Sequence, residues 1–410
     1  MSRYDDQFSS PDNRLTVKKL RRKFENGQLH FRPITGNSKY SWQRLPWWKR
    51  PRKILLINSI YTGVTMPAIF AYEDDEDNFY LVDGQQRCTA IMEFLNDGLK
   101  LTHKGMMERD NVQLHPDLEG KRFSDLTNEQ QDRILDYNLR AEVINGDNRQ
   151  DPEFFRRVKQ EFHILNTTAG TMGAAEIKRS IFQGDMIDLM FDLQKSLGFV
   201  GPDQKDTSVN MRDVQANYLL AQFRVASPTA ILRMQDIDML LQLAYMVTKK
   251  GPQHKEDGLE DFCRDNIAMS THRQKKLMTE MFENFVIITR MQSEEFAVDA
   301  SEFRKWHDFY SLYAAVDELR REGVLSGRDD LEAHGSNLDW LSIGLVAHKK
   351  SVESPDLLKE WKDMADQIPS AIVRKIPGYN LTKQRDWNVT LSREIRRDLI
   401  KEVLSRRNRI

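Results

Sequence analysis

The sequence lacks the features that mark secreted, metal-binding and membrane-spanning proteins. It contains only two cysteines in 410 residues, Cys88 and Cys263, too few for a disulfide framework or a thiolate metal cluster. The nine histidines are scattered, with no His-x-x-x-His pair of the kind that binds zinc. No apolar run approaches the length of a membrane span, and residues 1–13 lack the apolar core of a secretion signal. We therefore expect a protein of the reducing cytoplasm that makes no membrane contact.

The sequence also lacks an excess of either charge. Its 61 Lys and Arg residues balance 62 Asp and Glu residues, which gives a formal net charge of -1. Any surface that binds nucleic acid must therefore be a local patch. The length of 410 residues is enough for two or three domains, each with its own core.

Two regions of the chain differ in their apolar pattern. Strands are expected at residues 29–31, 67–72, 79–82 and 139–144, and helices of the same region at residues 15–24 and 52–61. Helical periodicity then continues at residues 152–165, 174–182, 186–197, 212–223, 229–247, 271–291, 301–321, 356–367 and 391–404. The sequence therefore predicts an α+β fold, with a small mixed α/β domain at residues 1–150 and a larger all-helical domain at residues 151–410.

The most informative segment is a strand pattern that runs directly into a helix pattern. Residues 79–82 are apolar, Asp83 and Gly84 mark a sharp turn, and residues 85–87 open an amphipathic helix. The first turn of a helix has unpaired N–H groups and the positive end of the macrodipole, which favour an anion. Arg87 adds a forked cation that suits phosphate. The segment is typical of a phosphate-binding turn, although an ordinary turn with a solvated arginine fits the same pattern.

Residues 83–87, DGQQR, resemble the signature of the GmrSD-type restriction endonuclease N-terminal domain family, whose fold is related to ParB and sulfiredoxin. Two further blocks follow the order of that family. Residues 43–48 resemble its YQR-x-x-x-W motif, and residues 166–176 resemble its N-T/S-G-G…L-S-x-x-E segment, both with departures. The resemblance covers residues 15–184 and implies a ParB/sulfiredoxin-like nucleotide-binding domain.

The resemblance also implies roles for individual residues. The nucleotide-binding residues would be Gln43, Arg44, Gly84, Gln85, Gln86, Asn166 and Thr167, and residues 151–185 would close over the nucleotide. Asp83 and Arg87 would be catalytic, with Asp83 placing Mg²⁺ or a water molecule, or else only orienting the turn. Glu176 is expected to cap a helix or, as the alternative, to act as a base.

Two side-chain types near this turn have alternative interpretations. Trp42, Trp47 and Trp48 lie among cations, which suits base stacking, but tryptophans also fill the edge of a core. Cys88 follows Arg87 at a helix start, where a thiol can be activated. A small buried helix residue is the other interpretation of Cys88.

The C-terminal segment is locally basic. Residues 381–410 contain nine cations and four anions, a local charge of +5. We expect Arg393, Arg397, Arg406 and Arg407 to bind nucleic acid, beside an apolar side formed by Leu391, Ile395, Leu399 and Val403. The alternative is a terminal helix packed by that apolar side, with a solvated basic face.

These features predict a nucleotide-binding, NTP-hydrolysing module of a DNA restriction or anti-phage defence system, with an NTP and Mg²⁺ as cofactors. One alternative is a metal-dependent DNA nuclease that uses the same cleft. Another is a non-catalytic regulator that binds DNA or a partner and is gated by nucleotide. Many relatives carry an HNH nuclease domain, and because the sequence shows no such pattern, we expect a separate nuclease partner protein.

Overall fold

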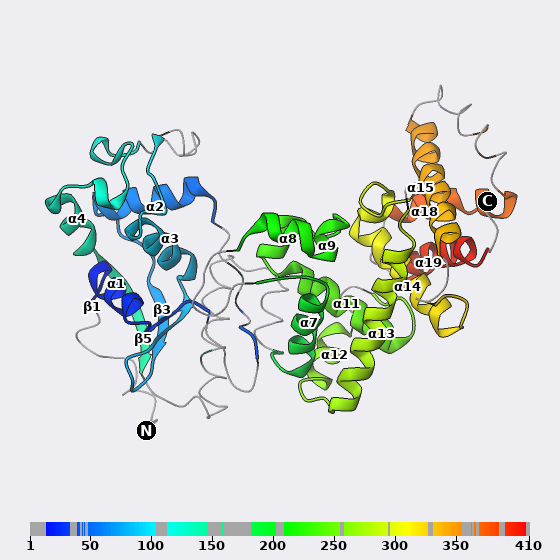
Figure 1. Cartoon of the computed structure of the whole chain (residues 1–410), viewed down its shortest axis with the longest axis horizontal. Coiled ribbons are helices and arrows are strands. Elements are labelled where there is room, and N and C mark those ends of the chain that lie inside the picture. The colour runs from blue at the N-terminus through cyan, green and yellow to red at the C-terminus, as the bar shows by residue number, and fades with distance from the viewer. Residues whose placement is uncertain are drawn as a thin grey trace. The chain divides into compact units, whose positions relative to one another are not determined.

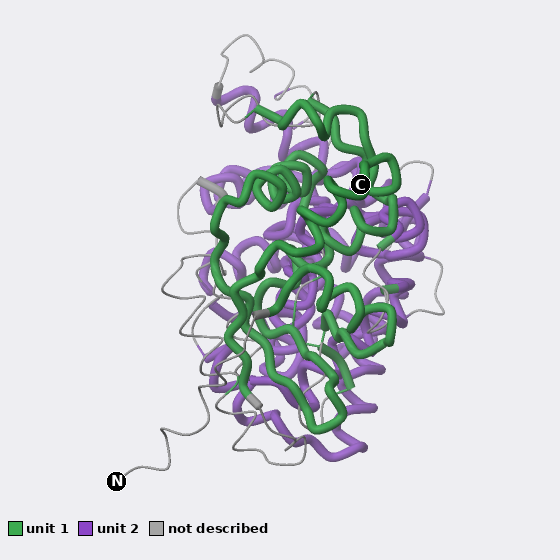
Figure 2. The backbone as a smooth tube through the Cα atoms, turned by 90° about the vertical axis from the view of Figure 1, so that its left-hand side faces the viewer, with its two compact units in different colours: residues 1–181, 201–209 green, residues 182–200, 210–410 purple. Residues whose placement is uncertain are grey.

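The computed structural model describes residues 14–32, 39–41, 43, 45, 48–103, 113–145, 158, 182–201, 209–254, 258–293, 296–326, 331–353, 362, 365, 369–384 and 390–406. The chain divides into two compact units (Figure 2). Unit 1 comprises residues 1–181 and 201–209, and unit 2 comprises residues 182–200 and 210–410. The domain boundary predicted at residue 150 stays a prediction, because residues 146–157 lie outside the described residues.

Unit 1 contains a five-stranded mixed sheet. Its strands are β1 (Arg14–Thr16), β2 (Leu29–His30), β3 (Ile69–Glu73), β4 (Phe79–Asp83) and β5 (Asn138–Asn145). Their order in the sheet is β1-β5-β3-β4-β2. Strand β4 pairs in parallel with β2 and antiparallel with β3, while β5 is parallel to β3 and antiparallel to β1. The four predicted strands are confirmed, and β1 is an additional strand in a segment predicted to be helical.

Four α-helices of unit 1 accompany this sheet (Figure 1). They are α1 (Val17–Glu25), α2 (Arg50–Thr62), α3 (Gln85–Leu95) and α4 (Asn128–Leu135). Alternate strand residues face opposite sides of the sheet, as the pleat requires. Ile69 and Leu81 share the main core with the apolar residues of α1, α2 and α3, whereas Phe70 and Val82 belong to a smaller cluster that includes Val158. The helices therefore cover one face of the sheet, and α3 begins at its edge.

The described residues of unit 2 form helices and the segments that connect them, with no β-strand among them. Its helices are α7 (Asp185–Ser196), α8 (Met211–Asn217), α9 (Leu219–Gln222), α10 (Pro228–Leu232), α11 (Gln235–Lys249), α12 (Leu259–Asp265), α13 (Thr271–Arg290), α14 (Trp306–Arg321), α15 (Glu332–Glu353), α17 (Ser370–Val373), α18 (Ile376–Gln384) and α19 (Thr390–Leu404). The predicted α+β fold class is confirmed. Within the described residues, no helix has both the length and the apolar character needed to cross a bilayer.

Several predicted helix boundaries were wrong. The single helix expected at residues 229–247 is two helices, α10 and α11, because Met234 between them has a left-handed backbone with φ 57°. The helix expected at residues 212–223 is likewise divided into α8 and α9 at Tyr218. The helices expected at residues 152–165, 174–182 and 356–367 lie almost entirely outside the described residues. Helices α4, α12, α15, α17 and α18 were not predicted.

Candidate functional site

The turn between β4 and α3 is the geometrical centre of the candidate site. Asp83 ends β4, and Gly84 caps α3 with a left-handed backbone of φ 93°. A Cβ atom on Gly84 would lie 3.0 Å from Cγ1 of Ile69 and 3.3 Å from Nη2 of Arg87. The turn therefore needs glycine for both its backbone angle and its space. The predicted strand-turn-helix arrangement is confirmed, and the first amides of α3, which have no partner within the helix, directly follow Asp83.

Arg87 is engaged with protein oxygens. Its Nη1 donates to the carbonyl oxygen of Pro67, and its Nη2 donates to the carbonyl oxygen of Ala68 over 2.9 Å. The same Nη2 lies 3.0 Å from Oδ2 of Asp83. The Arg87 side chain is 12% exposed and that of Asp83 is 43% exposed. Arg87 thus ties the turn to the chain entering β3, while Oδ1 of Asp83 has no partner among the described residues.

Two glutamines join the segment at residues 43–48 to this turn. The Gln43 amide donates to the carbonyl oxygens of Leu81, over 2.6 Å, and of Val82, over 3.2 Å. The Gln86 amide accepts a hydrogen bond from the Trp48 backbone and donates to the carbonyl oxygen of Leu45. Both glutamine side chains are buried. The structure therefore brings together two predicted site residues that are far apart in the sequence, and it gives both of them positioning contacts.

Three buried polar atoms near this turn have no hydrogen-bond partner among the described residues. They are Oε1 of Gln43, Nε2 of Gln85 and Oγ1 of Thr89. Gln85 and Thr89 are four residues apart and therefore share one face of α3. A buried polar group without a partner costs about 1–3 kcal/mol, and native proteins rarely leave such groups unpaired. A polar ligand or water bound against these atoms would remove that cost.

Arg32 is a cation that contacts the predicted site residue Gln43, and the sequence did not single it out. Strand β2 runs parallel to β4, so the chain leaving β2 reaches the same sheet edge as the turn at Asp83. The half-buried Arg32 guanidinium donates from Nη2 to the carbonyl oxygen of Gln43 over 3.2 Å. Burial lowers the pKa of Arg32 to about 10. No carboxylate among the described residues pairs with Arg32. Its place near Asp83 follows from the parallel pairing of β2 with β4, which would have been needed to predict it.

Residues 37–219 match a known family domain. The match is to the GmrSD restriction endonuclease, N-terminal domain. This GmrSD domain includes all three blocks that carried the resemblance, while Arg32 lies before it. The match indicates a component of a restriction or defence system. A comparison with curated proteins and a comparison with solved structures each found no match, so the relation to ParB and sulfiredoxin stays a prediction.

Part of the predicted GmrSD site lies outside the described residues. Arg44, Asn166, Thr167 and Glu176 belong to this part, as do Trp42 and Trp47. Trp48 is described: it packs against the core of unit 1, and the Arg52 guanidinium lies 4.4 Å above its ring. The core interpretation therefore holds for Trp48, and the roles predicted for the other residues stay predictions.

Cys88 is a buried residue of the GmrSD domain. It is 0% exposed, and burial raises the pKa of its thiol to about 12, with opposing effects from Arg87 and Asp83. A thiol with so high a pKa is a poor nucleophile near neutral pH. The structure therefore favours the packing role of Cys88 over the activated one.

The arginines predicted to bind nucleic acid lie beyond the GmrSD domain, on or after α19. Arg393 is 2% exposed, and its guanidinium lies 4.0 Å from the centre of the Tyr310 ring and donates to the carbonyl oxygen of Gln253. Arg397 pairs with Glu318 over 3.1 Å. Their placement gives a nucleic-acid role no support, so that role stays a prediction. Arg406 lies 3.6 Å from Glu402, and Arg407 lies outside the described residues.

The predicted apolar side of α19 packs only in part. Leu399 and Val403 are buried, but Leu391 is 64% exposed and Ile395 is 39% exposed. The expectation of one continuous packed apolar side was therefore wrong. The physical reason is that the first half of α19 turns arginines inward, where the Tyr310 ring and neighbouring acceptors on other elements accommodate them.

Oδ1 of Asp83 is a carboxylate oxygen at the turn that has no partner among the described residues. Among the described residues, no group of three or more His, Cys, Asp or Glu side chains could hold a metal ion. Magnesium often needs only one or two protein carboxylates, because substrate phosphates and water complete its coordination. Oδ1 of Asp83 fits that requirement, and the expected Mg²⁺ stays a prediction.

Proposed function

We propose that the β4–α3 turn binds the phosphates of a nucleotide and supports their hydrolysis. The observation that carries this proposal is the combination of a helix start, an available Asp83 oxygen and three buried polar atoms without partners at one turn. Among the described residues, neither the available Asp83 oxygen nor the three atoms without partners makes a hydrogen bond that would stabilise the fold. Their coincidence favours a ligand-binding role for the segment.

The phosphate-binding part rests on the start of α3. This helix has 11 residues, and its first amides have no partners within the helix. The amides and the macrodipole together favour an anion at this end. The left-handed Gly84 allows the tight turn that presents these amides, because a side chain there would press against Ile69 and Arg87.

The hydrolytic part rests on Asp83. Its Oδ2 is held by Arg87, which fixes the direction of the carboxylate, and its Oδ1 remains available. A bound Mg²⁺ would supply charge stabilisation at the phosphates. Phosphoryl transfer depends mainly on positioning and electrostatic stabilisation. One oriented carboxylate beside a helix start can supply both of these at the phosphates. The carboxylate can hold that ion or orient the attacking water.

The biological setting of the proposal comes from the family match. A restriction endonuclease domain is consistent with action on DNA. We propose that nucleotide binding at the turn controls a restriction or defence reaction on DNA, in which a partner protein supplies cutting.

The test is to measure turnover and binding of ATP, GTP, CTP and UTP by the full chain with Mg²⁺. We expect Asp83→Asn to lower turnover by about 100-fold, which is the order lost with one charge-stabilising contact, and to leave nucleotide binding within a few-fold of wild type. Asp132→Asn, on the exposed surface of α4, is the matched control and should leave turnover unchanged.

The outcomes separate the parts of the proposal. Absence of binding to all four nucleotides by the wild-type chain contradicts the proposed function as a whole. Equal turnover by wild type and Asp83→Asn contradicts the hydrolytic role of Asp83 alone. Cutting of DNA by the chain itself, lost in Asp83→Asn, supports the nuclease alternative instead.

A further inference from the structure

We propose that Arg32, and not Arg87, is the side chain that grips the phosphates at this site, while Arg87 positions the turn. The inference rests on the proposed function, because it concerns the ligand of the same turn. It adds a binding residue that lies before the matched GmrSD domain.

Arg32 lies close to the end of a strand that runs parallel to β4. Ligands of mixed and parallel sheets bind beyond the carboxyl ends of parallel strands. Strands β2 and β4 are such a parallel pair, with Leu29 opposite Phe79 and His30 opposite Tyr80. Arg32 lies two residues beyond His30, the last residue of β2, and Asp83 is the last residue of β4. Because the two strands are parallel, both residues lie at the same end of the sheet. It therefore lies on the side of the sheet where α3 begins.

The guanidinium groups of Arg87 and Arg32 differ in the acceptors that they already bind. The Arg87 group donates to two backbone carbonyls and to the Asp83 carboxylate, so a counter-charge already neutralises it. The Arg32 group donates from Nε and Nη2 to one uncharged acceptor, the carbonyl oxygen of Gln43. Its Nη1 has no partner among the described residues. Of these two arginines, Arg32 is therefore the one that has an N–H group without an acceptor and a charge without a counter-ion among the described residues.

The Arg32 cation is desolvated without a counter-ion among the described residues. A guanidinium that is partly removed from water without a counter-ion carries a desolvation cost, and the lowered pKa of Arg32 reflects that cost. An anion bound against Nη1 would offset it and would be held by a charge-assisted hydrogen bond. Without an anion, such a cation destabilises the fold, whereas with a bound anion it contributes to ligand affinity.

Gln43 links this cation to the rest of the site. Its carbonyl oxygen accepts from Arg32, while its side-chain amide is fixed on the carbonyl oxygens at the end of β4. Its buried Oε1 is an acceptor without a donor among the described residues. A cation beside an unfilled acceptor suits a ligand that carries both an anion and a hydroxyl or amino donor. A nucleotide has both, whereas inorganic triphosphate offers only the anion.

The test is isothermal titration of the full chain with each of the four NTPs and with inorganic triphosphate, in EDTA so that no metal contributes. Hydrogen bonds to charged groups are worth about 1.5–3 kcal/mol, so we expect Arg32→Gln to weaken binding by about 10- to 100-fold. Arg32→Lys keeps the charge without the fork and should lose only part of the affinity. Arg140→Gln, on the 73% exposed Arg140 of β5, is the control and should bind as wild type. The affinity for inorganic triphosphate should fall in Arg32→Gln by the same factor as the affinity for the NTPs, but triphosphate should bind the wild-type chain more weakly than the NTPs do.

The melting temperature of the ligand-free chain is the second readout. Substitution of an arginine that stabilises the fold lowers this temperature, whereas substitution of an arginine that serves only to bind ligand keeps or raises it. We expect Arg32→Gln to keep or raise it, since an uncompensated cation is removed, and Arg87→Gln to lower it. If Arg32→Gln binds all probes as wild type does, this inference is overturned while the proposed function stands. If the wild type binds no nucleotide, the proposed function itself fails. Should Arg32→Gln not fold, wild-type affinity in Arg32→Lys together with a lower melting temperature would also overturn the inference.

Discussion

Gly84 determines whether the β4–α3 turn can form. Its φ of 93° lies in the region where residues with a Cβ are strained, and an added Cβ would lie 3.0 Å from Ile69 and 3.3 Å from Arg87, so that these side chains would have to shift. The nearest atoms belong to Ile69 and Arg87, the two residues that hold β3 and the helix start together. The backbone angle and the packing therefore make the same demand at one position.

We expect Gly84→Ala to destabilise unit 1 by about 1–3 kcal/mol, the usual cost of a non-glycine residue in a disfavoured backbone region. Urea unfolding followed by circular dichroism measures this loss. Gly27→Ala is the matched control, because Gly27 has φ 72° but no atom within 4 Å of the added Cβ. The difference between the two variants isolates the contact with Ile69 and Arg87. Equal losses would mean that this contact has no effect.

The candidate site was only partly predictable at this scale. The sequence located the turn, because an apolar strand followed by Asp-Gly has few other structures. It did not reveal which way each side chain faces. Gln86 and Arg87 were expected to meet a ligand, but their hydrogen bonds go to backbone groups of distant segments. Arg32 was missed because its position depends on β2 pairing in parallel with β4, which sequence alone does not fix.

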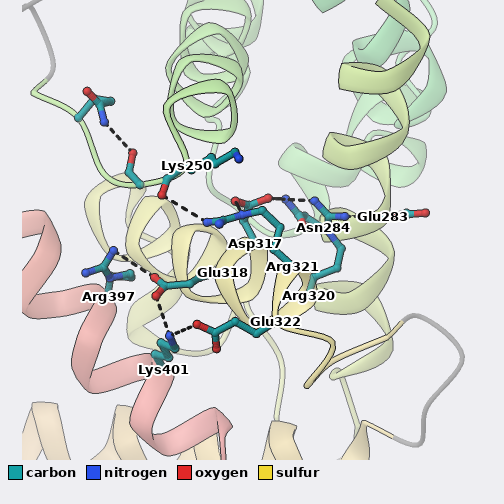
Figure 3. Close-up of polar contacts among 12 residues, drawn as sticks. Lys250, Glu283, Asn284, Asp317, Glu318, Arg320, Arg321, Glu322, Arg397 and Lys401 are labelled. Atoms are coloured by element: carbon teal, nitrogen blue, oxygen red, sulfur yellow. Dashed lines mark hydrogen bonds and ion pairs between the residues drawn. The ribbon is translucent and has the colours of Figure 1, made fainter. Parts of the chain in front are cut away.

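At the scale of elements, α14 organises the polar contacts of unit 2 (Figure 3). Toward α13, the buried Asp317 accepts hydrogen bonds from Asn284, Arg320 and Arg321. Toward α19, the pairs Glu318–Arg397, Glu318–Lys401 and Glu322–Lys401 connect the helices. The first set surrounds a fully buried carboxylate, whereas the second is half-exposed. The two sets should therefore differ in their contribution to stability.

We expect Asp317→Ala to destabilise unit 2 by about 3 kcal/mol, because it leaves Arg320 and Arg321 without their shared counter-ion. The value lies at the low end for buried pairs, since both arginines retain some contact with water. Chemical unfolding measures the change. Glu322→Gln removes a partner that is 45% exposed and should cost less than about 1 kcal/mol. A loss as large for Glu322→Gln would contradict the distinction between the two sets.

Helix existence was easier to predict than helix ends. Apolar periodicity identified α7, α13, α14 and α19, but it passed over the left-handed Met234 that separates α10 from α11. It also missed α4, although the side chains of Thr127 and Gln130 form a capping box at its start. The inward position of Arg393 was not predictable, because its acceptors Gln253 and Gln242 lie 140 and 151 residues away in the sequence.

At the scale of the whole molecule, the fold class followed from composition and periodicity, because alternating and helical patterns occupy separate parts of the chain. Each unit has a buried core of its own. In unit 1, the core joins the sheet to α1, α2 and α3, and in unit 2, it is built around residues such as Phe309 and Tyr313 of α14. Cores that are separate in this way can respond separately to substitution.

We expect Gly84→Ala and Asp317→Ala to act on different units of the same chain. Gly84→Ala should speed amide hydrogen exchange in β4 and leave α14 unchanged, whereas Asp317→Ala should speed exchange in α14 and leave β4 unchanged. Hydrogen exchange followed by mass spectrometry of the full chain resolves both segments in one experiment. If either variant speeds exchange equally in β4 and α14, the two units unfold as one cooperative body. In that case, the stability of the proposed nucleotide site would depend on α14, and, where the proposed function holds, an Asp317→Ala chain should also bind nucleotide less tightly.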